Sequence, residues 1–220
     1  SRNWKVDMRD YINDFVKKQV PEGMAYDGKQ MVDALRYYLT SIGPETKDSE
    51  FTWKGFQDST NTELVGNLAG FVHRVLVLTH KNYDGLVPAI DPSREFVSGW
   101  NAEQRTNYDS ELHLLRQKLG ELGHEIEQFN FREALRILME ISSAGNALLQ
   151  FNEPWRQVKE NPELVKVVLN LGLQYVTALS DSASLPNELS RVPSRLHRIP
   201  RSLPSRNGRW QLLAKKPKPC

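Results

Sequence analysis

Two side chains about eighty residues apart could together bind an unstacked RNA base. Arg74 lies in a predicted helix, and its planar guanidinium can donate to base edges or to phosphates. Trp155 follows Pro154 in a predicted turn and offers a flat ring, on which a splayed base stacks with about 1–3 kcal/mol. Each residue also has an ordinary structural interpretation, Arg74 as a solvated or ion-paired side chain and Trp155 as a core or capping aromatic.

Other chemistries find little support in the residues. Four histidines, each in a predicted helix, lack a second His or Cys three or four positions away, so we predict no metal site: His73, His80, His113 and His124. The single cysteine, Cys220, excludes an internal disulfide framework and favours a reducing, cytoplasmic setting. We find no Gly-rich phosphate loop, nucleophile triad or convincing carboxylate pair, and therefore predict no catalytic site from the residues themselves.

Charge is distributed unevenly along the 220 residues. The formal net charge is +2, but nine of the 29 basic residues and only two of the 27 acidic ones lie from Ser180 onward. The preceding part of the chain is therefore mildly acidic, and RNA binding there must be local and specific, since a general positive field is absent. No apolar run approaches the roughly 20 residues that a membrane-spanning helix needs.

Apolar residues recur at helical spacing through most of the chain. This spacing predicts helices over residues 7–18, 30–42, 62–80 and 101–127, a further helix from Asn130, and a last one from Pro162 to Leu179. The 101–127 helix has the most regular stripe: Leu112, Leu115, Leu119, Leu122, Ile126 and Phe129. The last helix is apolar nearly all round, which places it at the centre of a bundle.

The predicted helix ends carry recognisable signals. Asn130 and Glu133 have the spacing of a capping box, and Asn161-Pro162 has the form of an N-cap followed by Pro at the first helical position. The Asp84-Gly85 to Pro92 stretch predicts a loop.

The overall prediction is a mostly α fold in three parts. Residues 1–56 form a small mixed α/β remnant, residues 57–179 a helical bundle, and residues 180–220 a disordered tail. The tail holds six of the twelve prolines and many Ser and Arg residues, so disorder or an out-of-frame origin is expected.

Several segments, in order along the chain, resemble methionyl-tRNA synthetases. They are residues 33–39 (DALRYYL), 44–53 (PETKDSEFTW), 63–74 (ELVGNLAGFVHR) and 151–155 (FNEPW). The first four residues, SRNW, match the end of the family's K-M-S-K-S loop, which closes on ATP phosphates, and the residues just after it. The resemblance covers about residues 1–179. It implies the C-terminal part of a class I aminoacyl-tRNA synthetase, beginning inside the catalytic core.

The resemblance assigns roles to particular residues. It implies that Arg74 and Trp155, with Asn152 of the N-E-P-W turn, bind the tRNA anticodon, and that Ser1 and Arg2 are the end of the K-M-S-K-S loop. The full enzyme would use ATP and methionine to charge tRNA. This chain lacks the family's H-I-G-H-type motif and most of the lysine loop, so we expect it to bind tRNA, to bind no cofactor and to be inactive alone.

One position departs from the family pattern. One helical turn before the Arg, the family normally has an Asn that helps to read the first anticodon base, and this chain has Gly70. We expect weaker anticodon discrimination unless Asn67 or His73 compensates.

Two alternatives remain open at this point. The bundle could be the anticodon domain of another class I synthetase, such as a leucine, valine or cysteine enzyme. It could also be a non-enzymatic scaffold whose Leu112–Phe129 stripe binds a protein partner.

Overall fold

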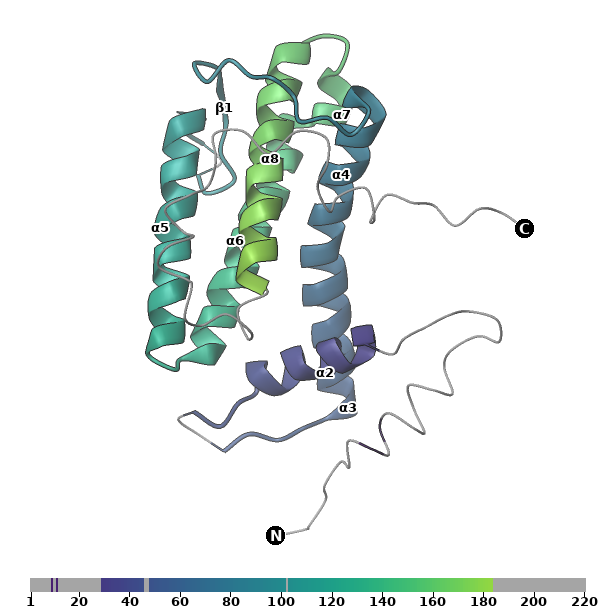
Figure 1. The fold of residues 1–220 in the computed structure, drawn as a ribbon, viewed down its shortest axis with the longest axis vertical. Helices are drawn as coiled ribbons and strands as arrows, with labels where there is room; N and C mark the ends of the chain where they lie inside the picture. The colour runs from purple at the N-terminus through teal and green to yellow at the C-terminus, as the bar shows by residue number, and fades with distance from the viewer. Residues whose placement is uncertain (1–8, 10, 12–28, 46–47, 102, 184–220) are drawn as a thin grey trace, which may run out of the picture.

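The computed structural model describes residues 9, 11, 29–45, 48–101 and 103–183. Within them the chain is mostly helical, which confirms the predicted fold class. Figure 1 shows α4, α5, α6 and α8 lying side by side, with α2 crossing one end of this bundle. The elements are α2 (Lys29–Ser41), α3 (Trp53–Ser59), the π-helical segment η3 (Thr60–Ala69), α4 (Gly70–Tyr83), β1 (Glu95–Val97), β2 (Arg105–Asn107), α5 (Tyr108–Glu127), α6 (Phe131–Asn152), α7 (Pro154–Gln157) and α8 (Pro162–Ala183).

Helix α8 is the centre of the bundle, as its sequence predicts. Asn161 caps the helix, since its Oδ1 accepts a hydrogen bond from the backbone N–H of Leu164, and Pro162 is the first helical residue. Every residue from Val167 to Val176 is buried. The helix continues to Ala183, past the residue where the predicted bundle ended.

Helix α5 begins seven residues later than predicted, at Tyr108 rather than Asn101. Asn107 caps it by accepting from the backbone N–H of Ser110, and residues 105–107 pair instead with residues 95–97 as an antiparallel hairpin. A two-stranded hairpin therefore lies within the connection between α4 and α5, where the sequence predicted a loop up to Pro92 and a helix from Asn101 but no strand.

The apolar stripe of α5 packs inside the chain. Leu112, Leu115, Leu119 and Leu122 are buried in the main core. The prediction fails at Phe129, which is 72% exposed, because α5 ends at Glu127 and Phe129 adopts a positive φ of 62° that breaks the helical phase. Because the buried part of the stripe closes the core, it is not available to bind a protein partner. The alternative of a scaffold that binds through this stripe is therefore not supported.

The helix predicted over residues 62–80 is longer than expected. Helical structure is continuous from Trp53 to Tyr83 through α3, η3 and α4, and it starts at Thr52, whose hydroxyl accepts from the backbone N–H of Gly55. The proposed boundary near residue 56 thus lies within a continuous helix. η3 is tied to α2, because the Tyr37 hydroxyl donates to Glu63 Oε2 at 2.6 Å.

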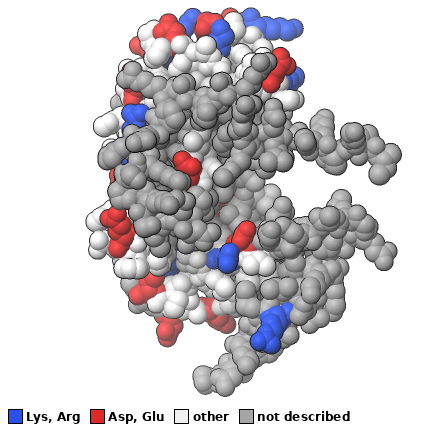
Figure 2. Space-filling view, viewed as in Figure 1, with Lys and Arg blue, Asp and Glu red and all other residues white. Residues whose placement is uncertain are grey.

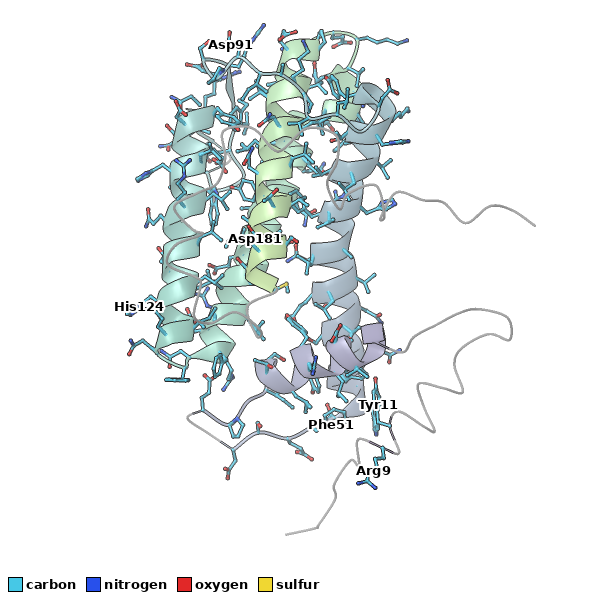
Figure 3. All side chains as sticks on the ribbon, in the orientation of Figure 1. Arg9, Tyr11, Phe51, Asp91, His124 and Asp181 are labelled. Atoms are coloured by element: carbon cyan, nitrogen blue, oxygen red, sulfur yellow. The ribbon has the colours of Figure 1, made fainter. Side chains whose placement is uncertain are left out.

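The N-terminal part has a small aromatic core of its own. Tyr11, Leu35, Tyr38 and Phe56 are buried together, and Figure 3 shows Tyr11 and Phe51 at the same end of the bundle. Helix α2 confirms the predicted helix to within one residue at each end. The described residues 29–45 and 48–56 contain helices and turns without a strand, so the expected mixed α/β character is not found there.

The start of α6 is capped from a distant part of the chain. The predicted Asn130–Glu133 capping box is wrong: the Asn130 side chain donates to Glu125 Oε2, and Glu133 pairs with Arg136. Glu45 instead accepts a hydrogen bond of 2.9 Å from the backbone N–H of Arg132. A carboxyl group at a helix N-terminus is favourable for the helix dipole, so this contact fastens the α2 region to the bundle.

Candidate nucleic-acid interface

The turn that presents Trp155 is imposed by Pro154. Proline disfavours the right-handed helical conformation of the residue before it, so α6 must end there. Glu153 accordingly adopts a left-handed conformation with φ of 40°, and its N–H still donates to the Leu149 carbonyl. Pro154 then begins the short helix α7, and Glu153 is held by an ion pair of 2.9 Å with Arg156.

Trp155 points outward from this turn with 39% of its surface exposed. Phe151, one helical turn earlier, is 45% exposed. An aromatic ring that is anchored in a proline turn and yet open to solvent can stack on a base without a change in the fold. The core interpretation of Trp155 is therefore not what the structure shows.

Asn152 is oriented differently from what the resemblance implies. Only 7% of it is exposed, and its amide is occupied inside the protein. Oδ1 accepts from the backbone N–H of Val97 at 3.3 Å, while Nδ2 donates to the carbonyls of Val97 and Leu148 at 2.8 and 2.9 Å. This geometry makes Asn152 a residue that joins α6 to β1, and its amide has no spare surface to offer a base.

Arg74 is partly buried and already oriented. Its Nε donates to the Gly70 carbonyl at 3.2 Å, and Nη2 donates to Oδ1 of Asn146 on α6. Among the described residues, Nη1 has no hydrogen-bond acceptor, so it can donate to a further one. The two bonds thus fix the orientation of the guanidinium before any ligand binds. This lowers the conformational-entropy cost of binding.

Asn146 is the residue that sequence reasoning missed. Its Nδ2 donates to Oδ1 and to the backbone carbonyl of Asn67, at 2.8 and 3.1 Å, while its Oδ1 accepts from Arg74. One amide therefore connects Arg74, η3 and α6. The available signal was an Asn within the apolar stretch of residues 144–149 (AGNALL), nine positions before Trp155.

Asn67 is fully engaged with α6. Besides the contacts with Asn146, its Nδ2 donates to Ser143 Oγ at 2.9 Å and to the Met139 carbonyl at 3.1 Å. Asn67 would have to break these bonds to take over the role of the missing Asn at position 70. His73, the other candidate substitute, is exposed.

Gly70 itself has room for a side chain. A Cβ built there would meet the Val65 carbonyl oxygen at 3.4 Å, which is an ordinary contact, and its backbone is right-handed helical. The glycine is therefore not required by the backbone.

The charged side chains of the described residues are of both signs on the face that Figure 2 shows. On the face shown in Figure 2, acidic and basic side chains are intermixed at the end of the bundle where α7 lies, and acidic side chains lie along the edge formed by α5. Figure 3 places Asp91 at the same end as α7 and His124 at the opposite end of α5.

Some predicted features fall outside the described residues: Ser1 and Arg2, most of the 7–18 helix, and the tail from residue 184. In the part of the chain that the structure describes, no group of three or more His, Cys, Asp or Glu side chains is arranged to hold a metal ion. No helix there has the length and apolarity that a membrane span needs.

Two family models match this sequence. One, described as tRNA synthetases class I (M), matches residues 17–76, and the other, described as the anticodon binding domain of methionyl tRNA ligase, matches residues 101–212. The second match covers about half of the chain and continues past residue 180. The disorder or out-of-frame origin expected for residues 180–220 stays a prediction.

Curated relatives point to the same family. The chain is 38% identical over 180 residues to the methionine–tRNA ligase of Cytophaga hutchinsonii, covering 82% of this chain and 23% of that protein. It is 40% identical over 202 residues to the methionine–tRNA ligase of Porphyromonas gingivalis, covering 89% and 26%. The chain thus spans about a quarter of the length of these relatives.

The fold also has solved counterparts. The apo form of Mycobacterium tuberculosis methionyl-tRNA synthetase aligns with a TM-score of 0.60 and 19% identity, over 73% of this chain and 32% of that one. The same enzyme bound by methionyl-adenylate aligns with a TM-score of 0.60 over 77% of this chain and 32% of that one. At this identity the likeness shows the fold alone.

Proposed function

Because this chain belongs to the methionine–tRNA ligase family, we propose that its helical bundle reads the anticodon loop of a tRNA. Arg74 donates to the edge or phosphate of an anticodon nucleotide, and Trp155 stacks on a splayed base. The observation that carries the proposal is the half-exposed Trp155 ring on a proline-fixed turn, in the same bundle as a guanidinium already held by Asn146.

The structure suggests separate tasks for the other residues. Asn146 and Asn67 orient Arg74, and Asn152 positions the turn from inside the protein. This division is supported by burial: Asn152 is 7% exposed, whereas Trp155 is 39% exposed.

At the level of the whole protein, we propose a cytoplasmic enzyme that uses ATP and methionine to charge tRNA. Residues 1–56 would be the end of its catalytic core, residues 57–179 the anticodon-binding domain and residues 180–220 a Ser/Arg/Pro-rich tail. Because the nucleotide-binding motifs are missing from this sequence, the purified chain is expected to show no ATP–pyrophosphate exchange.

The deciding experiment measures binding of the 220-residue chain to a methionine-tRNA anticodon stem-loop and to one with a scrambled anticodon, each at two salt concentrations. We expect tighter binding to the matched loop at both, with a shallow salt dependence because few phosphates are contacted. Equal, steeply salt-sensitive binding to both loops would contradict anticodon reading.

Restoring the family residue at position 70 should sharpen discrimination. In Gly70→Asn the new amide can reach the base that Arg74 contacts, and a specific hydrogen bond of this kind contributes about 1 kcal/mol, or roughly fivefold in affinity. The helix should also gain a few tenths of a kcal/mol, because Asn has a higher helix propensity than Gly.

The measurement is the affinity ratio between matched and scrambled stem-loops for the parent and Gly70→Asn. Gly120→Asn is the matched control, since Gly120 lies in α5 and a Cβ added there would have nothing within 4 Å. A ratio that rises equally in both variants, or in neither, would mean that position 70 does not face the anticodon.

A further inference from the structure

The segment Val97–Trp100, which begins at the last residue of β1, lies directly on the last turns of α6. At one end, the backbone N–H and carbonyl of Val97 both bond to the Asn152 amide, at 3.3 and 2.8 Å. This is the pairing that a neighbouring strand would make, supplied here by a side chain. Asn152 immediately precedes the Glu153-Pro154-Trp155 turn.

The middle of the segment approaches the α6 backbone so closely that only glycine fits. A Cβ at Gly99 would lie 2.2 Å from the Ala144 carbonyl oxygen and 2.9 Å from both the Ala147 Cβ and the Leu148 nitrogen. Two of these three obstacles are backbone atoms of a helix, which cannot move aside without bending it. Gly99 therefore sets the distance between the segment and α6.

A buried network holds the segment from the other side. Ser98 Oγ donates to Glu111 Oε2 at 2.7 Å, and the Tyr175 hydroxyl donates to Glu111 Oε1 at 2.5 Å. Trp100 Nε1 donates in turn to the Tyr175 hydroxyl at 2.7 Å. The segment is thus tied to both α5 and α8.

Burying this network costs desolvation free energy. Glu111 is fully buried and Ser98 is 3% exposed, and a carboxyl group in the interior is tolerated only when its oxygens are satisfied. Burial, reinforced by the charge of Glu111, holds the pKa of the Tyr175 hydroxyl well above its ordinary value, so it remains a donor. Apolar residues could fill the same space, but they would not specify one position for the segment.

We propose that Val97–Trp100 is a clamp that positions the Trp155 turn, with Asn152, Gly99 and Glu111 as its positioning residues. The clamp fixes the last turns of α6 from β1, α5 and α8 at once. Trp155 can then remain partly solvent-exposed and still be presented at one angle. This inference rests on the proposed anticodon reading, since positioning matters only if Trp155 contacts a base.

The test combines RNA binding with a signal from the Trp155 ring. Asn152→Ala removes the bonds to Val97, and Gly99→Ala forces the segment away from α6. We expect each to lower the ratio of matched to scrambled stem-loop affinity about tenfold, because a small misplacement of a contacting group loses most of its contribution. In the free protein, the Trp155 indole N–H resonance, assigned by its loss in Trp155→Phe, should shift in both variants.

The control variants separate positioning from stability. Gly120→Ala, in open space on α5, should leave both readouts unchanged. Glu111→Gln keeps the shape and can still bond to Ser98 and Tyr175, so it should retain most of the selectivity that Glu111→Ala loses. If Gly99→Ala does not fold, Asn152→Ala and the Glu111 pair decide the question.

Two different failures can be told apart. A parent protein that does not distinguish the stem-loops overturns the proposed function, while the indole resonance still reports whether the clamp moves Trp155. A selective parent whose folded Asn152→Ala and Glu111→Ala variants keep full selectivity and an unmoved Trp155 resonance overturns the clamp.

Discussion

Trp155→Ala is expected to weaken binding of the matched anticodon stem-loop by about 5- to 150-fold. The range corresponds to the roughly 1–3 kcal/mol that one base–aromatic stack contributes. The side chain is 39% exposed and lies after a helix end that Pro154 imposes, so its removal should leave the bundle folded. The decrease in affinity therefore measures the contribution of the stacking interaction and not a loss of folding.

The measurement is the dissociation constant for matched and scrambled stem-loops, with folding checked by circular dichroism. Trp155→Phe keeps a smaller π-face and should fall between the parent and Trp155→Ala. Phe129→Ala is the control, because Phe129 is a 72% exposed aromatic next to the start of α6, at the opposite end of that helix from Trp155. Comparable losses in Trp155→Ala and Phe129→Ala would show that exposed aromatics bind RNA without regard to position.

Phe71→Ala is expected to lower the free energy of unfolding by about 3–5 kcal/mol. Phe71 is fully buried, and its ring meets Tyr175 edge-on at 6.3 Å between centroids. The ring also fills the space over Gly145, where a Cβ would lie 2.4 Å from a ring carbon. Truncation therefore leaves a cavity at the point where α4, α6 and α8 meet.

Urea unfolding measures this loss as a lower midpoint with little change in slope. Val77→Ala is the matched control on the same helix, because Val77 is 47% exposed and should change stability by less than about 0.5 kcal/mol. A loss for Phe71→Ala no larger than for Val77→Ala would show that α4 does not pack in the main core. Such a result would also mean that packing does not set the spacing of α4 and α6, across which Arg74 and Asn146 bond.

Phe71 and Arg74 contribute to the packing and to the polar contacts of the same helix, α4. Phe71 holds α4 against α6 and α8, while Arg74, one helical turn later, reaches across to Asn146 on α6. The packing thus sets the spacing of the two helices, and the hydrogen bond then selects the orientation of the guanidinium.

Much of the helical architecture follows from local sequence. Residues 112, 115, 119 and 122 are Leu at helical spacing, which predicted a helix with one apolar face. That this face is buried in the main core was decided by the packing. Asn161-Pro162 likewise marks the start of α8, because an N-cap acceptor and a proline at the first helical position are local requirements. The exposed Phe129 was mispredicted because a single left-handed residue ends the helical phase, and no apolar pattern encodes that turn.

Residues that act through distant partners could not be assigned in this way. Glu45 caps α6 from 87 positions away, replacing the capping box that Asn130 and Glu133 suggested. Asn152 follows the motif as closely as Trp155 does, yet one is buried and the other exposed. The difference depends on where β1 lies, and the sequence pattern predicted no element over residues 95–97.

The sequence by itself determined that this chain is a helical bundle with an Arg on one helix and a Trp on a proline turn, because helical periodicity and proline geometry act over a few residues. Only the tertiary structure decided which polar side chains are exposed to solvent and which form hydrogen bonds inside the protein. Asn146, Asn152 and Glu111 find their partners on other elements, and such contacts exist only once those elements have packed together.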